Sequence, residues 1–289
     1  MTLGNGSHIF ILSIFSYNLL MAKDAKTKLT TVVFVLSVLL GIAIIVVPMV
    51  IGAINQARSD EAIRRYNEQL AQQEKERAEQ RFAEADEYNR ELSNGEKDEE
   101  KYAELLDSGD GMIGYISIPR IGIRDPIYHT VEEDVLQKGI GHLPNTSLPI
   151  GGLATHAALS GHRGLPSSKL FTDLDRIRVG DVILISVLTR KLAYEVYDIE
   201  VVDPHSAGNL EIDPNEDLLT LITCTPYGVN THRLLVHARR TEYKEGMDDI
   251  KTEHTLSESD RILLIALGVV ALILVVDIVV ILKRRRRLR

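Results

Sequence analysis

Cysteine and tryptophan are almost absent from this sequence, which has one cysteine, Cys224, and no tryptophan in 289 residues. A single cysteine excludes an intrachain disulfide framework and any zinc site built from several cysteines. The pairs His156/His162 and His232/His237 lack a Cys-x-x-Cys partner and do not form a His-Glu-x-x-His motif. The Walker loop, the dinucleotide-binding glycine fingerprint and the Gly-x-Ser-x-Gly elbow are also missing. We therefore expect neither a metal nor a cofactor.

Negative charge is in excess overall, but both ends of the chain are basic. The formal net charge is −8, with 33 basic and 41 acidic side chains. Lys23, Lys26 and Lys28 outnumber the single acid Asp24 near the N-terminus, and six of the residues 283–289 are basic. The body between these ends is therefore strongly acidic and would repel phosphates. This distribution argues against nucleic acid as a partner of the body.

Two long apolar runs predict two membrane spans. Residues 32–54 carry no charge and, as a helix, would extend about 34 Å, against a hydrocarbon core of about 30 Å. Residues 262–282 form the second run, interrupted only by Asp277, whose cost the surrounding Leu, Ile and Val outweigh. Asp277 is either a polar contact between helices or a protonated or snorkelling group. Basic residues collect on the cytoplasmic side of spans, so both termini would be cytoplasmic and residues 55–261 would lie outside.

The N-terminal segment, residues 1–31, is expected to be cytoplasmic. Its apolar stretch Ile9–Leu20 is too short to span a membrane, although it has the length of a signal-peptide core. Met21-Ala22-Lys23 is a conventional start directly ahead of the first span. We therefore interpret residues 1–20 as an upstream misreading of the start codon.

Residues 55–110 predict a helical region outside the membrane. Half of residues 58–107 are charged, and glycine and proline are nearly absent before Gly95. Ala, Glu, Gln and Arg dominate, which favours two helices with a break near residues 93–95. Apolar residues are too sparse for a sustained coiled coil. We expect a solvated stalk or helices packed along a domain surface rather than a partner-binding helix.

Residues 111–240 predict one mainly β domain with a few short helices. Short runs of alternating or β-branched residues are separated by Gly, Pro, Asn and Asp, which is typical of a barrel or a sandwich. Residues 241–261 would link this domain to the second span, and residues 283–289 would form a basic cytoplasmic tail. The expected strands begin at residues 113, 121, 182, 191, 218 and 233, and the expected short helices lie around 132–138 and 170–177.

The sole cysteine stands at the end of a predicted strand. Cys224 follows Thr220–Thr223 and precedes a turn. A lone cysteine is often only a small buried hydrophobe, but strand ends are where reactive groups become accessible. Arg233 opens the next strand nine residues later, and alternation places it on one face with Leu235 and His237. Beside Cys224 this arginine would stabilise an oxyanion; the alternative is a surface salt bridge.

A cysteine nucleophile needs a proton acceptor or an electrostatic partner, and a histidine supplies both. His162 lies between two glycines in Gly161-His162-Arg163-Gly164, directly after an apolar run at 157–159. A glycine-flanked loop at a strand end suits a functional imidazole. The sequence alone leaves other candidates open: His129, His142, His156, His232 and His237.

Both of these regions resemble motifs of a known family. Residues 220–224 followed by Arg233 resemble the cysteine signature of the sortases, and residues 161–164 resemble their histidine motif. In longer form, residues 159–174 and 221–236 resemble class C, the pilus-assembling sortases. Agreement over motifs of this length is specific.

The resemblance implies a fold and a membrane arrangement. The catalytic domain, residues 111–240, would be an eight-stranded sortase-type β-barrel with short helices. A helical stalk would precede it, and two transmembrane helices would flank the whole extracytoplasmic part. Many class C sortases carry an Asp-Pro-aromatic lid ahead of the barrel, but residues 94–111 contain Tyr102 and no proline. We therefore predict either no closed lid or one held by unrelated contacts.

The resemblance also implies an activity. Cys224 would attack the Thr–Gly carbonyl of an LPXTG-like sorting signal and form a thioester, and His162 would give a proton to the departing amine. Arg233 would hold the substrate and the oxyanion, and Thr223 and Thr225 would bind substrate beside the cysteine. The acyl group would pass to a lysine amine of the next pilin, so the expected partners are pilin subunits and the membrane. The alternatives are a sortase that anchors surface proteins to cell-wall peptide and a non-enzymatic surface binding module.

Overall fold

The computed structural model describes most of the chain between residues 25 and 249. The chain divides into two compact units, residues 1–49 with 260–289 and residues 50–259. The proposed start at Met21 and the basic tail lie outside the described residues. Those described are 25–72, 75–165, 168–204 and 210–249, together with 265, 268–270, 272–273, 276 and 279.

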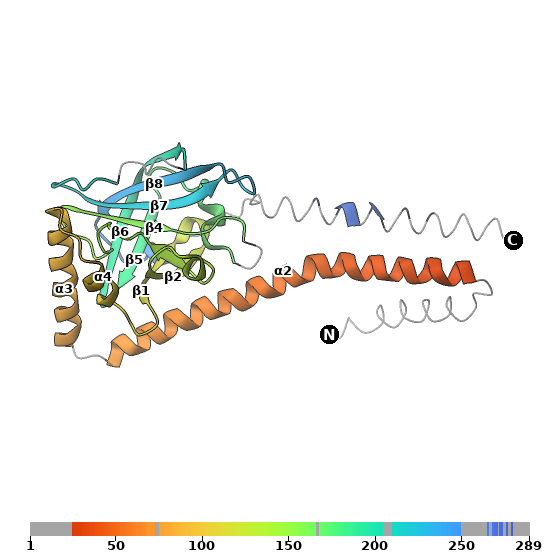
Figure 1. Cartoon of the computed structure of the whole chain (residues 1–289), viewed down its shortest axis with the longest axis horizontal. Helices are drawn as coiled ribbons and strands as arrows, with labels where there is room; N and C mark the ends of the chain where they lie inside the picture. The colour runs from red at the N-terminus through yellow and green to blue at the C-terminus, as the bar shows by residue number, and fades with distance from the viewer. Residues whose placement is uncertain are drawn as a thin grey trace. The chain divides into compact units, whose positions relative to one another are not determined.

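Eight strands of the second unit close into a barrel in the order β1-β2-β3-β4-β7-β8-β6-β5 (Figure 1). Strand β2 pairs with β3 and β4 pairs with β7 in parallel, and the other neighbours are antiparallel. The predicted eight-stranded barrel is thereby confirmed. The strands are β1 Met112–Ile118, β2 Ile123–His129, β3 Ile140–His142, β4 Thr155–Ser160, β5 Val182–Val187, β6 Arg190–Val202, β7 Asp217–Thr225 and β8 His232–Thr241. The short helices among them are η1 Pro119–Ile121, α5 Glu133–Leu136, η2 Leu170–Arg176 and η3 Met247–Asp249.

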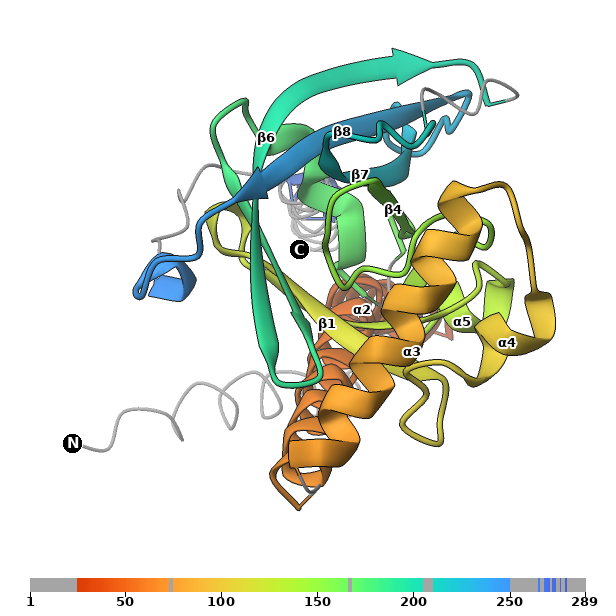
Figure 2. The ribbon, with the colours of Figure 1, turned by 90° about the vertical axis from the view of Figure 1, so that its left-hand side faces the viewer.

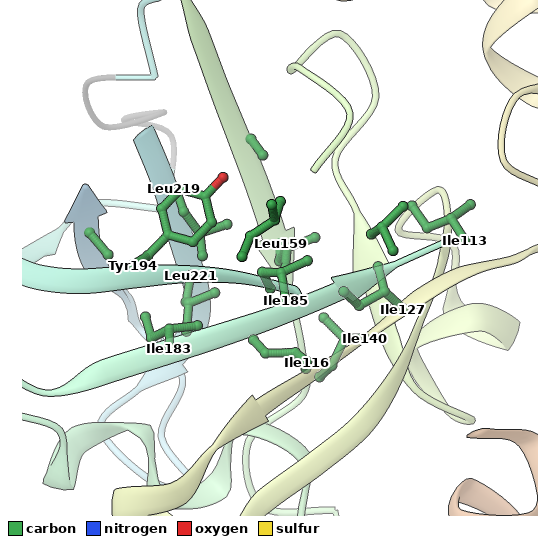
Figure 3. Close-up of a cluster of buried hydrophobic side chains, with 14 of the residues drawn as sticks. Ile113, Ile116, Ile127, Ile140, Leu159, Ile183, Ile185, Tyr194, Leu219 and Leu221 are labelled. Atoms are coloured by element: carbon green, nitrogen blue, oxygen red, sulfur yellow. The ribbon is translucent and has the colours of Figure 1, made fainter. Parts of the chain in front are cut away.

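Branched aliphatic side chains fill the barrel (Figure 3). Ile116 on β1, Ile127 on β2, Ile140 on β3, Leu159 on β4 and Leu221 on β7 are all fully buried. Successive side chains of a strand point to opposite faces, so a slip of one residue would carry such side chains out of the core. The core therefore fixes the strand registers, and these registers position the site described below.

Helix α3 and the second half of α2 pack on the barrel. Helix α2 spans Ala25–Gln72, of which residues 50–72 belong to the barrel unit, and helix α3 spans Lys75–Ser93 and lies beside the strands in Figure 2. In the part of α2 that belongs to the barrel unit, the Tyr66 hydroxyl donates to the Ile113 carbonyl and accepts from the Leu188 amide, at 3.1 and 2.8 Å. From α3, the Asn89 side chain pairs with both the amide and the carbonyl of Leu148, at 2.7 and 3.0 Å. Of the expected alternatives for residues 55–110, these contacts favour helices packed along the domain surface.

Residues 94–111, the segment where a lid would lie, are attached to the barrel by hydrogen bonds to two histidines. Helix α4, Glu99–Glu104, places the Tyr102 hydroxyl 2.9 Å from His142 Nδ1, and the same hydroxyl accepts from the Thr130 amide at 3.2 Å. The Leu105 carbonyl accepts from His129 Nε2 at 2.7 Å. Within the described chain, these hydrogen bonds go to β2 and β3 and their connection. The expectation of either no closed lid or a lid held by unrelated contacts stays a prediction.

One helix is long and apolar enough to cross a membrane. The portion Thr31–Gln72 of α2 contains a window with a mean hydropathy of 3.0 and covers the first expected span, residues 32–54. This is the one such helix among the described residues. Most of the second expected span, residues 262–282, lies outside them, as does most of the linker 241–261.

Candidate active site

Of the three residues expected to act together, Cys224 and Arg233 are paired across neighbouring strands, and His162 follows the strand on the other side of β7. Strands β4 and β7 run parallel with Ser160 opposite Ile222, and the Gly161 amide continues this ladder by donating to the Ile222 carbonyl at 3.1 Å. If this register is continued two residues beyond the Ser160–Ile222 pair, His162 corresponds to Cys224. On the other side of β7, Cys224 pairs directly with Arg233 of β8. We call His162, Cys224 and Arg233 the reactive row.

The order of side chains along β8 agrees with the predicted alternation. Leu234, Val236 and Ala238 belong to the barrel core. Arg233 and Cys224 are both partly exposed, and Cys224 carries a free thiol. An arginine paired with a partly exposed cysteine is able to bind developing negative charge next to the sulfur.

Gly161 sets the path of the chain into His162. A Cβ at this position would lie 2.7 Å from Ile140 Cδ1 and 2.8 Å from Phe171 Cδ2, so the close approach requires glycine. The Thr223 hydroxyl donates to the Gly161 carbonyl at 2.7 Å, and the Phe171 amide donates to the His162 carbonyl at 3.1 Å. The loop that carries His162 is therefore fixed on both sides of the histidine.

The two threonines beside Cys224 are held by groups of the protein. Thr223 is 2% exposed and is occupied with Gly161. The Thr225 hydroxyl accepts from Arg163 Nη1 at 2.9 Å. Within the described chain, both hydroxyls thus serve contacts that fix the backbone on either side of the cysteine.

Arg163 is a functional neighbour that the residue-by-residue reading of the sequence did not identify. Its side chain is 2% exposed and also donates to Asp175 Oδ2 at 2.5 Å. The guanidinium lies 5.9 Å from the ring centroid of Tyr227, within the range of a cation–π contact. In the sequence, the one indication of this role is that Arg163 directly follows His162. Only the fold shows that Arg163 connects the histidine loop with η2 and the end of β7.

The other candidate histidines have structural partners. His142 is fully buried, which lowers its pKa to about 4, and burial also lowers the pKa of His129. Both hold the α4 segment, as described above. His232 is exposed at the start of β8. Among these candidates, His162 is the one that follows β4 beside the end of β7, which carries Cys224.

His156 and His237 belong to a chain of four hydrogen bonds. His156 contacts the Glu211 carbonyl at 2.9 Å and the Thr220 hydroxyl at 2.7 Å. The same hydroxyl contacts His237 at 2.9 Å. His237 in turn contacts the Glu200 carboxylate at 3.1 Å. Both ends of the chain are acceptors, so the four bonds need four protons. Two neutral imidazoles and one hydroxyl supply three. All four contacts can therefore be hydrogen bonds at the same time only when one further proton is present.

The described residues contain no group of three or more His, Cys, Asp or Glu side chains placed to hold a metal ion.

Comparisons with known proteins agree with this geometry. The family model described as sortase domain matches residues 116–241. Curated sortases A and D align at 25 to 30% identity over 125 to 130 residues, and the chain covers 52 to 63% of their length.

Three solved structures cover more of the chain. Sortase C1 from Streptococcus agalactiae is 43% identical with a TM-score of 0.62, over 64% of this chain and all of that one. Sortase C from Streptococcus pneumoniae is 40% identical, with a TM-score of 0.60 over 63% and 97% of the two chains. Clostridium perfringens sortase C, solved with a C-terminal cell wall sorting motif, is 41% identical, with a TM-score of 0.59 over 63% and 99%. The three similar structures are class C sortases. This chain belongs to the sortase family.

Proposed function

We propose that this protein is a class C cysteine transpeptidase that polymerises pilus subunits. It would cleave an LPXTG-like sorting signal between Thr and Gly and transfer the new acyl group to a lysine amine of a pilin. The observation that carries the proposal is the pairing of Cys224 with Arg233 on β7 and β8, next to β4, which leads into His162, in a chain of the sortase family.

The reaction would proceed in two acyl transfers. The Cys224 thiolate attacks the threonine carbonyl, and Arg233 stabilises the oxyanion that develops. The C–N bond to glycine then breaks, and His162 gives its proton to the departing amine. In the second step the lysine amine attacks the thioester carbon, the C–S bond breaks, and the amine proton passes to His162.

Thr223 and Thr225 would assist substrate binding by holding the backbone around Cys224. Their hydroxyls bond to Gly161 and Arg163, which supports this positioning role for the two residues expected to bind substrate. The pneumococcal sortase C structure is described with reference to pilin substrate specificity, and the C. perfringens structure contains a sorting motif. By similarity, pilins with such signals are the proposed partners. The curated relatives are sortases A and D, so a cell-wall peptide amine is the alternative acceptor.

The intact mass of the full-length chain in detergent micelles tests the activity. After mixing with an LPXTG-type peptide, an adduct on Cys224 that hydroxylamine removes is expected, followed by an amide-linked product when a pilin with a free lysine is added. Cys224→Ala should form neither. A stable amide to a cell-wall peptide but not to pilin would favour the anchoring alternative. Absence of any adduct, with Cys224 still open to thiol reagents, would count against the LPXTG-like signal.

The proposed topology has spans at residues 32–54 and 262–282, both termini in the cytoplasm and the barrel outside. The apolar window of α2 and the basic ends of the chain support it. Because Cys224 is the sole cysteine, it is a native probe of sidedness. A membrane-impermeant maleimide should label Cys224 in intact cells and should leave Cys224→Ala unlabelled. Labelling only after lysis would contradict the topology.

A further inference from the structure

One nitrogen of the catalytic histidine candidate has no ordinary partner. His162 Nε2 is buried and accepts or donates no hydrogen bond within the described chain. The group that approaches it is the Glu133 carboxylate of α5, with Oε2 at 3.4 Å. The His162 side chain is 25% exposed and the Glu133 side chain is 71% exposed. When the imidazole is protonated, the contact is an ion pair between His162 and a surface carboxylate.

The Glu133 carboxylate is held in place from its own helix. Its Oε1 accepts from Gln137 Nε2 at 2.6 Å, which leaves Oε2 directed toward the imidazole. The pKa of Glu133 is lowered, first by this hydrogen bond with Gln137 and then by the charge of His162. The carboxylate is therefore negative at neutral pH, and its orientation does not depend on His162 alone.

The other charges near His162 are directed elsewhere. The adjacent Arg163 bonds to Asp175 and Thr225. Arg233 is separated from His162 by the β7 strand that carries Cys224. Glu133 is thus the one carboxylate within ion-pair distance of His162 in the described part of the chain.

We propose that Glu133 is a positioning residue for His162, and that its carboxylate favours the imidazolium form that must protonate the departing amine. This inference rests on the proposed transpeptidase function. As the C–N bond breaks, the proton passes from the imidazolium to the amine nitrogen, and Glu133 keeps its charge throughout. Contacts of this kind are often long or poorly aligned in free enzymes and shorten when substrate binds, which fits a 3.4 Å pair without an aligned hydrogen bond.

The chain offers a matched control on the same short helix. Asp134 follows Glu133 in the first turn of α5 and is exposed. Glu133→Gln and Asp134→Asn each remove one negative charge from α5, but only the first removes the carboxylate that faces His162. A difference between these variants therefore reports the local contact and not the general field of the helix.

Steady-state kinetics with an LPXTG-type peptide should separate the variants of the full-length enzyme in micelles. We expect Glu133→Gln to lower kcat about two- to fivefold, in the range of an exposed ion pair, with KM nearly unchanged. The alkaline limb of its kcat/KM profile should move down by about 0.3 to 0.7 pH units. Asp134→Asn should match the wild type, and 1 M salt should narrow the difference by screening. Equal profiles for all three proteins, or equal shifts in both variants, would overturn the proposal.

A second readout does not need a sorting signal. The rate at which iodoacetamide alkylates Cys224 increases with the fraction of the cysteine that is thiolate, and a neighbouring imidazolium stabilises the thiolate. In Glu133→Gln the midpoint of the alkylation–pH profile should move upward, whereas Asp134→Asn should leave it in place. If the wild type forms no acyl-enzyme, the proposed function fails while this profile still tests Glu133. A normal acyl-enzyme with unchanged alkylation profiles would reject the role of Glu133 and keep the function.

Discussion

At the scale of single residues, the reactive row depends on neighbours that never face the sulfur. Thr223 and Thr225 stand one residue before and after Cys224, and the resemblance to the sortases implied that both bind substrate. The structure gives each hydroxyl a partner within the protein, Gly161 for Thr223 and Arg163 for Thr225. These contacts support the proposal that each threonine affects catalysis through the backbone that it holds.

Thr223→Val tests this indirect role because valine has nearly the same shape. The substitution leaves the buried Gly161 carbonyl without its donor, which should lower the free energy of unfolding by about 1–2 kcal/mol. Since His162 follows Gly161, we expect a reduced kcat with little change in KM. Urea denaturation and steady-state kinetics measure the two effects. A raised KM with unchanged stability would instead indicate direct contact with the substrate.

At the scale of elements, the sequence predicted most of the strands but not the pairing that builds the site. The runs beginning at residues 113, 121, 182, 191, 218 and 233 correspond to β1, β2 and β5–β8. β3 has only three residues, too few for a periodic pattern, and β4 is a short apolar run whose partner is not encoded locally. The parallel β4–β7 pairing joins segments about sixty residues apart. For that reason strand patterning could place Cys224 and Arg233 together across a hairpin but could not choose His162 among the histidines. That choice came from the resemblance of residues 161–164 to the sortase histidine motif.

The hydrogen-bonded chain between Glu200 and Glu211 links β6, β8, β7 and β4 and makes a prediction about protons. In the wild type, four bonds require one more proton than the neutral side chains supply. In Glu200→Gln the amide N–H donates to His237, so neutral imidazoles satisfy every bond. At pH 8 we expect Glu200→Gln to be at least as stable as the wild type, and Glu200→Ala to be less stable by up to about 1 kcal/mol. Equal destabilisation by glutamine and alanine would contradict this proton count.

Docking of α2 on the barrel rests on a buried hydroxyl. Tyr66 is 2% exposed and bonds to the Ile113 carbonyl and the Leu188 amide. Tyr66→Phe keeps the ring but leaves both backbone groups unpaired. We expect a loss of about 1–3 kcal/mol in the free energy of unfolding, measured by denaturant titration in micelles. A change within about 0.3 kcal/mol would show that water replaces the hydroxyl, as at an open interface.

At the scale of the whole molecule, the single helix α2 contributes residues to both units of the chain. Residues 32–49 of α2 carry no charge and belong to the unit of residues 1–49, whereas residues from 50 onward belong to the barrel unit. The apolar run was evident in the sequence because an uncharged stretch of this length matches the thickness of a bilayer and exceeds what a barrel core needs. Docking of the second half was not evident, because its contacts use scattered residues such as Ser59, Ile63 and Tyr66 among many charges.

Asp125, the hydrogen-bond partner of Ser59, makes the stability of the barrel unit depend on pH. This residue of β2 is 4% exposed, and burial raises the pKa of Asp125 to about 6 from an ordinary value of 3.8. A carboxyl whose pKa is raised on folding contributes stability below its unfolded pKa and loses it as the pH rises through its folded pKa. The contribution should therefore fall between about pH 4 and pH 6.

Asp125→Asn isolates this contribution, because the amide keeps the hydrogen-bonding shape without the charge. At pH 7 the variant should be more stable than the wild type by about 2–3 kcal/mol, and at pH 4 the two should be nearly equal. Denaturant titrations of both proteins at several pH values give the difference, in which the titrations of all other groups cancel. If the difference stayed constant from pH 4 to pH 7, Asp125 would not titrate in this range, and the carboxylate would have to be stabilised at the α2–β2 contact by more than Ser59.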